Sequence, residues 1–197
     1  MQESTGVSHP RSSSSAIESF ARSRQGEVAL LIGLGILLAA SHLISRGSLH
    51  LPGHHGVVDM AILLAARQIM RHPWSATLAS IAAAGFAVIP GTGFGSSAPL
   101  LYLLPGLVVD LGYRFAPQWR TSILFLTALA ALGYGAKPLG RWLIAAVSDA
   151  HFGSLAHGLA YPLFSHLVFG LLGGLVAAWG WRAARGHGGI RDRIFRK

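Results

Sequence analysis

Residues 159–181 read LAYPLFSHLVFGLLGGLVAAWGW, a run without a charged side chain. About 20 consecutive apolar residues are enough for an α-helix to cross the hydrocarbon core of a bilayer. This run is therefore predicted to be a transmembrane helix. Five similar segments precede it, and the six predicted spans are Val28–Ile44, Val57–Met70, Trp74–Ile89, Ala98–Gly112, Thr121–Gly135 and Leu159–Trp181.

The composition agrees with a membrane protein. The chain has 197 residues, of which 52% are apolar and 12% are charged, and its mean hydropathy is +0.50. These values are too apolar for a soluble domain of this length. We predict an all-α integral membrane bundle of six transmembrane helices over residues 27–183, between a polar N-terminal tail (1–26) and a basic C-terminal tail (184–197). The absence of cysteine excludes disulfides and thiolate metal sites.

The basic residues predict the orientation of this bundle. When six spans alternate across the membrane, all but three of the 16 lysine and arginine side chains fall on one face, the exceptions being Arg46, Lys137 and Arg141. Cytoplasmic flanks of membrane helices carry the excess of Lys and Arg. We therefore expect a multi-pass protein of the cell (inner) membrane with both termini in the cytoplasm.

Two local features lie outside the simple alternation of spans and loops. Leu139–Val147 is too short to cross the bilayer and follows Lys137-Pro138, so it is either an interfacial helix or an extension of the fifth span. Asp110 and Arg114 are four residues apart near the inner end of the fourth span. At that spacing they are predicted to form an ion pair on the helix surface.

Most of the ten histidines fall on the outer side in this topology. Imidazole is a ligand for Zn, Cu, Fe and Ni, but no spacing matches a zinc signature, and hydrogen bonding to an organic ligand is an equal alternative. Whether these histidines bind a metal is left open. Tyrosines near the same boundary form either an aromatic belt or a pocket wall. The candidate substrate-binding residues are His50, His54, His55, Asp59, Tyr102, Tyr134, His157, Tyr161 and His166.

Catalytic motifs are missing from the sequence. The glycine-rich stretch 90–97 lacks the lysine of a phosphate-binding loop, and neither a Gly-x-Ser-Gly nor a His-Glu-x-x-His motif is present. We therefore predict no enzymatic activity and no cofactor.

Small residues four apart allow helices to approach closely. On the first span the pairs Ala29/Gly33 and Gly35/Ala39 are thus candidates for docking a partner subunit in the membrane.

Between Val28 and Trp181 the chain resembles the S components, the substrate-capturing membrane subunits of energy-coupling factor transporters. The resemblance rests on size, six spans, cytoplasmic termini, the small-residue stripe of the first helix, a long first external loop and the outer polar cluster. It implies a ligand cavity in the outer half, closed by His50–Asp59, Pro90–Ser97 and Lys137–His157. It also implies a membrane scaffold subunit and ATPase subunits as separate chains.

The expected function is accordingly capture of a small vitamin-like molecule or, as a second choice, a metal or metal chelate. The amino terminus Met1-Gln2-Glu3 departs from the Met-His start of the nickel and cobalt branch. The alternative function is a non-catalytic membrane scaffold or assembly protein, in which the small-residue stripes bind a partner and the histidines bind nothing. The sequence fixes neither the substrate nor the oligomeric state, and it predicts no nucleic-acid partner.

Overall fold

The computed structural model describes residues 23–44, 53–70, 72–89, 96–148, 150–156 and 158–186. Over these ranges the chain forms six α-helices and two short 3-10 turns, and no β-strand. The helices are α2 (Arg24–Ile44), α3 (Gly56–Ile69), α4 (Ser75–Ala87), α5 (Ala98–Phe115), α6 (Ile123–Val147) and α7 (Ala160–Gly186); the turns are Pro117–Trp119 and Gly153–Leu155. The predicted all-α class is confirmed, and each predicted span falls on one helix.

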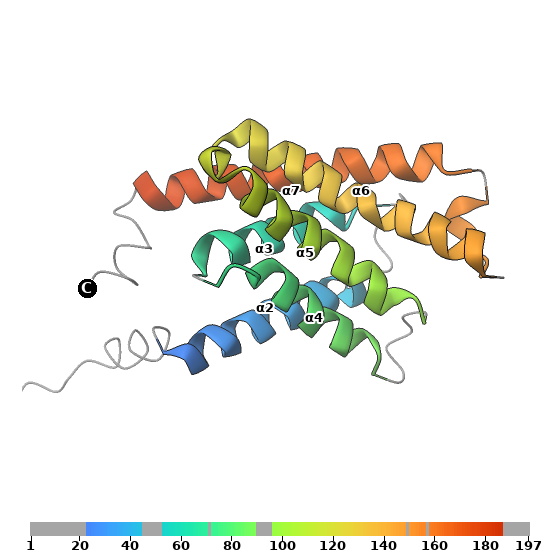
Figure 1. Ribbon diagram of the computed structural model, residues 1–197, viewed down its shortest axis with the longest axis horizontal. Coiled ribbons are helices and arrows are strands. Elements are labelled where there is room, and N and C mark those ends of the chain that lie inside the picture. The colour runs from blue at the N-terminus through green and yellow to red at the C-terminus, as the bar shows by residue number, and fades with distance from the viewer. Residues whose placement is uncertain are drawn as a thin grey trace, which may run out of the picture.

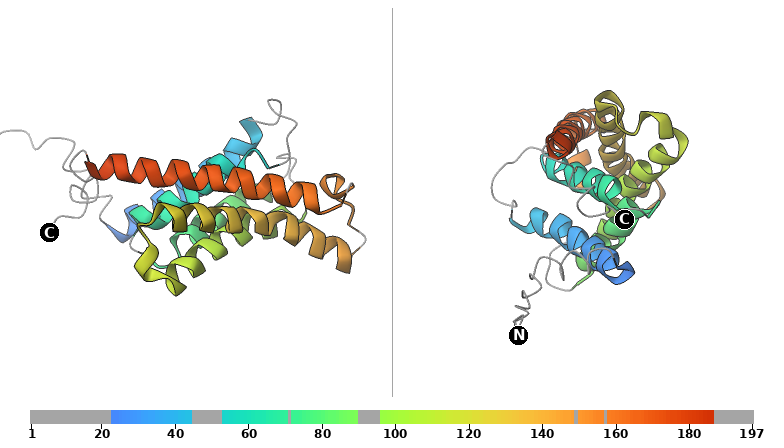
Figure 2. Two further views of the ribbon diagram at one scale, coloured as in Figure 1. Left: turned by 90° about the horizontal axis from the view of Figure 1, so that it is seen from above. Right: turned by 90° about the vertical axis from the view of Figure 1, so that its left-hand side faces the viewer.

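Successive helices run in alternating directions along the bundle, so α2 begins and α7 ends at the same end (Figures 1 and 2). The closest neighbours are α6 with α7 and α5, α3 with α7, and α4 with α2 and α5. Helix α2 packs mainly on α4 and leaves much of its surface outside the bundle.

Three helices in the described part of the chain, α2, α6 and α7, are long and apolar enough to cross a membrane, so the chain is a multi-pass membrane protein. Helices α3 and α4 have 14 and 13 residues. At 1.5 Å per residue each is about 20 Å long, against about 30 Å of hydrocarbon. Helix α5 has 18 residues, with Pro105 and Asp110 inside it. Large apolar side chains such as Leu132 and Trp179 are exposed on the outside.

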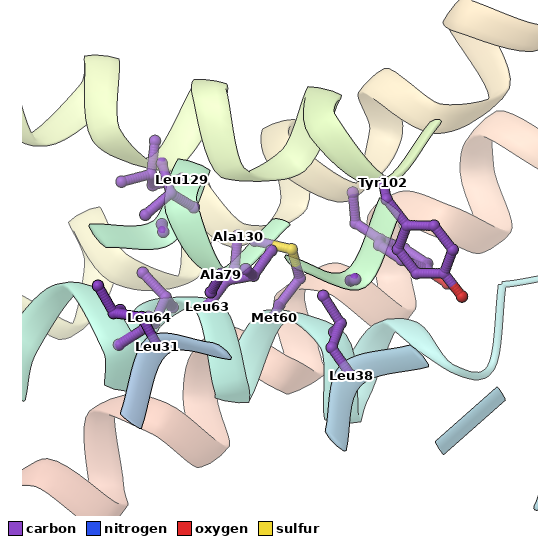
Figure 3. Close-up of a cluster of buried hydrophobic side chains, with 14 of the residues drawn as sticks. Leu31, Leu38, Met60, Leu63, Leu64, Ala79, Tyr102, Leu129 and Ala130 are labelled. Carbon is purple, nitrogen blue, oxygen red and sulfur yellow. The ribbon is translucent and has the colours of Figure 1, made fainter. Parts of the chain in front are cut away.

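The core combines leucines with alanines (Figure 3). Leu38 of α2 and Leu63 of α3 are almost completely buried, and Ala79 of α4 and Ala130 of α6 are fully buried. Lipid tails are as apolar as leucine side chains, so the hydrophobic effect does not drive membrane helices together. They associate through close packing instead. Small side chains in the contact faces make this packing possible.

Asp110 of α5 supplies the N-terminal cap that α4 lacks. The residue before α4, Trp74, makes no capping hydrogen bond through its side chain. Instead, the Asp110 carboxylate accepts hydrogen bonds from the backbone N–H and the hydroxyl of Thr77, both at 2.7 Å, and from the backbone N–H of Ala76 at 3.4 Å. Orphan N–H groups at a helix start need such acceptors, and the helix dipole favours a negative charge there.

The predicted surface pair between Asp110 and Arg114 is wrong. Asp110 faces the interior, where its ion-pair partner is Arg67 of α3, with Nε at 3.3 Å from the carboxylate. Arg114 is exposed. The Asp110 side chain faces inward because α4 supplies N–H donors and α3 supplies the cation Arg67. Together these interactions stabilise the carboxylate more than one pair on the helix surface, which contributes a few tenths of a kcal/mol.

Helix α6 continues without a break to Val147, so Leu139–Val147 extends the fifth predicted span. It is therefore not a separate interfacial helix. The prediction that Lys137 belongs to an external loop is also wrong, because Lys137 lies inside α6 and is 5% exposed. Pro138 follows it within the helix, where the chain tolerates the loss of one backbone hydrogen bond.

The described ends extend slightly beyond the predicted membrane domain. Helix α2 begins at Arg24, where the Ser23 hydroxyl accepts a hydrogen bond from the backbone N–H of Gly26 at 3.0 Å. Helix α7 runs to Gly186. Residues 1–22 and 187–197 of the predicted tails lie outside the described residues.

Candidate ligand-binding site

The carboxylate of Asp59, in the first turn of α3, is the centre of a polar cluster in the half of the bundle away from the start of α2 and the end of α7. The Lys137 ammonium of α6 donates to it at 2.7 Å, and His42 Nε2, from the last turn of α2, lies 3.0 and 3.1 Å from its two oxygens. Asp59 is fully buried. Because an unpaired charge there would cost several kcal/mol, these side chains hold three helices in one arrangement.

Two tyrosines flank the Lys137 ammonium. Its nitrogen lies 4.6 Å from the ring centroid of Tyr134 and 5.1 Å from that of Tyr102, close enough for cation–π attraction. The Tyr134 ring stacks on His166 of α7 at 4.9 Å. Both tyrosines are buried. Their place is therefore inside the bundle and not in an aromatic belt at the membrane boundary.

Three imidazole rings form a row beside this ion pair. His42 stacks on His55 at 4.1 Å with 22° between the planes, and His55 lies against His54 at 3.9 Å with 36°. Burial, and the nearby imidazoles of His42 and His54, lower the pKa of His55 to about 4. His55 is therefore uncharged at neutral pH, and its contribution to the cluster is a ring face and hydrogen-bonding nitrogens.

Glycines place the turn that carries His54 and His55. Gly53 has a φ of +86°, a conformation that favours glycine. A Cβ atom at Gly53 would come within 2.9 Å of Nδ1 of His166, and one at Gly56 would clash with the ring of Tyr134. The turn thus packs directly on α6 and α7. His166 is fixed in turn by donating from Nδ1 to the carbonyl of Pro162 at 2.7 Å.

This arrangement does not suit a metal ion. Ring nitrogens donate their lone pairs in the plane of the imidazole, so stacked rings point them in parallel and not toward one centre. Accordingly, no group of three or more His, Asp or Glu side chains in the residues that the structure describes is placed to hold a metal. The hydroxyls, ring nitrogens and charged groups are instead suited to hydrogen bonding with an organic molecule.

The structure brings together six of the nine predicted substrate-binding residues: His54, His55, Asp59, Tyr102, Tyr134 and His166. Tyr161 does not join them, since it is 57% exposed on the outside of α7. His50 and His157 lie outside the described residues. Asp59 lies in α3, as the second predicted span placed it, although the resemblance counted it in the first closing segment. Residues 137–147 of the third closing segment lie in α6 and not in a loop.

Sequence reasoning missed Lys137 and left His42 out of the site. It also missed Arg141, which lies one helical turn after Lys137 in α6. Both cations were counted as external loop charges because the fifth span was predicted to end at Gly135. The available signal was a lysine followed by an apolar, helix-compatible segment. An ionisable residue within a membrane helix is a functional candidate by default.

Comparison of the chain with protein families, with curated proteins and with solved structures finds no match. Its function is therefore inferred from the residues of the cluster and the architecture around them.

Proposed function

We propose that the chain is the substrate-capturing membrane subunit of an energy-coupling factor type uptake transporter, and that it binds a small vitamin-like molecule at the Asp59 cluster. The observation that carries this proposal is the buried Asp59–Lys137 pair with its imidazole and tyrosine neighbours. A bundle that serves only as a scaffold gains little from such a pair, because apolar residues of similar volume are often as stabilising. Ionisable groups at membrane depth usually mark a ligand or ion path.

The proposed topology has six crossings and cytoplasmic termini. Helices α3, α4 and α5 cross as parts of the bundle, where neighbouring helices and local thinning of the bilayer accommodate short segments. The end of the bundle at which α2 begins and α7 ends carries Arg24, Arg67, Arg114, Arg120 and Arg182. An excess of arginine favours the cytoplasmic side, so the Asp59 cluster occupies the outer half.

The partner surface in this proposal is the exposed part of the first small-residue stripe. Ala29 and Gly33 are exposed on α2, and no atom lies within 4 Å of a Cβ built on Gly33. Gly35 and Ala39, by contrast, are buried, and Gly35 packs against the backbone of Ala79 in α4. Only Ala29 and Gly33 are thus available for close approach of a scaffold helix.

Replacing Gly33 with leucine is expected to lower recovery of the scaffold and ATPase subunits at least about tenfold, because holding the helices apart costs at least about 1.4 kcal/mol of association energy. The measurement is co-purification of the tagged chain with co-expressed scaffold and ATPase subunits. Gly85→Leu is the matched control, since Gly85 of α4 is also exposed and has no atom within 4 Å of its Cβ position.

Equal recovery of the scaffold and ATPase subunits with both variants would show that Gly33 does not lie in the interface. A wild-type chain recovered without ATPase subunits and without a bound small molecule would instead support the alternative, a non-catalytic membrane scaffold or assembly protein.

A further inference from the structure

Two cations lie one helical turn apart on the inner face of α6. Lys137 is buried, and Arg141, four residues later, is partly buried. Like charges at this spacing repel each other on a helix, and the repulsion grows as water is excluded. Negative groups close to both cations stabilise an arrangement of this kind.

Asp59 neutralises only the first of them. Its carboxylate is 2.7 Å from Nζ of Lys137. Arg141 donates from Nη1 to the Ser154 hydroxyl at 3.4 Å, which is a long bond to a neutral acceptor. Among the residues that the structure describes, no carboxylate forms an ion pair with Arg141. Among the described side chains, one carboxylate and two cations therefore leave one positive charge in excess at Lys137 and Arg141.

On the basis of the function proposed above, we propose that the captured ligand is a small organic monocarboxylate with a planar ring, whose carboxylate binds the Arg141 guanidinium beside Lys137. The planar guanidinium fork matches a carboxylate with two parallel hydrogen bonds. A single negative charge balances the excess, whereas a phosphate, at about −1.5 to −2, exceeds it. His54, at the end of the histidine row, is partly exposed, and a planar ring suits stacking on its imidazole.

The test uses benzoate and benzamide, which share a shape and differ in charge, with inorganic phosphate as a third probe. Thermal unfolding of the full chain in detergent is followed against the concentration of each. Benzoate is expected to raise the unfolding temperature in a saturable way, and benzamide and phosphate are not. Arg141→Gln should weaken apparent benzoate affinity about ten- to a hundredfold, the effect of losing a charged hydrogen-bond partner, while Arg141→Lys retains part of it.

Arg114→Gln is the matched control, because Arg114 is an exposed arginine outside the cluster; it should bind benzoate like the wild type. Asp149, which lies outside the described residues, is tested by Asp149→Asn, and its benzoate affinity should equal that of the wild type. The proposal is overturned if benzamide or phosphate stabilises as well as benzoate, if benzoate has no effect, if Arg141→Gln binds normally, or if only Asp149→Asn binds benzoate. Co-purification with ATPase subunits tests the proposed transporter function independently of these results.

Discussion

Replacing Lys137 with methionine is expected to lower the free energy of unfolding by about 3–5 kcal/mol, the typical result of removing one partner from a buried ion pair. Of its two described hydrogen-bond partners, the Asp59 carboxylate would keep His42 alone, while its burial leaves no access to water. Methionine keeps the volume and the flexible stem of lysine, so lost packing contributes little. Reversible unfolding of the purified chain in detergent measures the change.

The double variant Asp59→Asn/Lys137→Met separates charge from packing. With both charges removed, most of the lost stability should return, and a cycle with Asp59→Asn alone gives the coupling energy of the pair. A single Lys137→Met variant within about 1 kcal/mol of the wild type would show that the pair does not hold the helices together.

Substitution of Gly173 by leucine is expected to prevent normal assembly of the bundle. A Cβ atom at this position would lie 2.6 Å from the carbonyl oxygen of Gly56 and 2.7 Å from that of Val57. These are backbone atoms of α3, so the side chain cannot be accommodated unless α3 and α7 separate. Overpacking commonly costs about 1–3 kcal/mol, and more where the neighbour cannot move.

Gly180→Leu is the matched control for this prediction, since Gly180 lies on the same helix and has no atom within 4 Å of its Cβ position. Size-exclusion profiles and unfolding temperatures in detergent compare the two variants. Gly180→Leu should behave like the wild type, while Gly173→Leu should aggregate or unfold at a much lower temperature. Normal behaviour of Gly173→Leu would mean that α3 and α7 do not pack as described.

The positions of the helices could be predicted from the sequence because hydropathy is a local property. The start of α5 at Ala98 and the end of α2 at Ile44 were placed correctly. The end of α6 was not, since Lys137 and Pro138 are typical of a loop when only their own chemistry is considered. Lys137 can be buried within a helix because its charge is paired with Asp59, which lies 78 residues away in the chain.

Many residues of the candidate site could be predicted from the sequence, but their positions relative to one another could not. Histidines, Asp59 and two tyrosines could be predicted to lie together from the predicted topology, because the residues at one end of a bundle lie near one another. The stacking of His42 on His55 depends on how α2 and the 53–55 turn meet, which sequence spacing does not encode. The same holds for Arg67, whose partner Asp110 is on another helix.

Native mass spectrometry of the full chain, purified gently in detergent, tests most directly whether the Asp59 cluster is a ligand site. We expect the wild-type chain to carry one small molecule, and the folded Asp59→Asn/Lys137→Met variant to carry none. A variant that retains the same molecule, or a wild-type chain that carries only lipid, would contradict the proposed capture function.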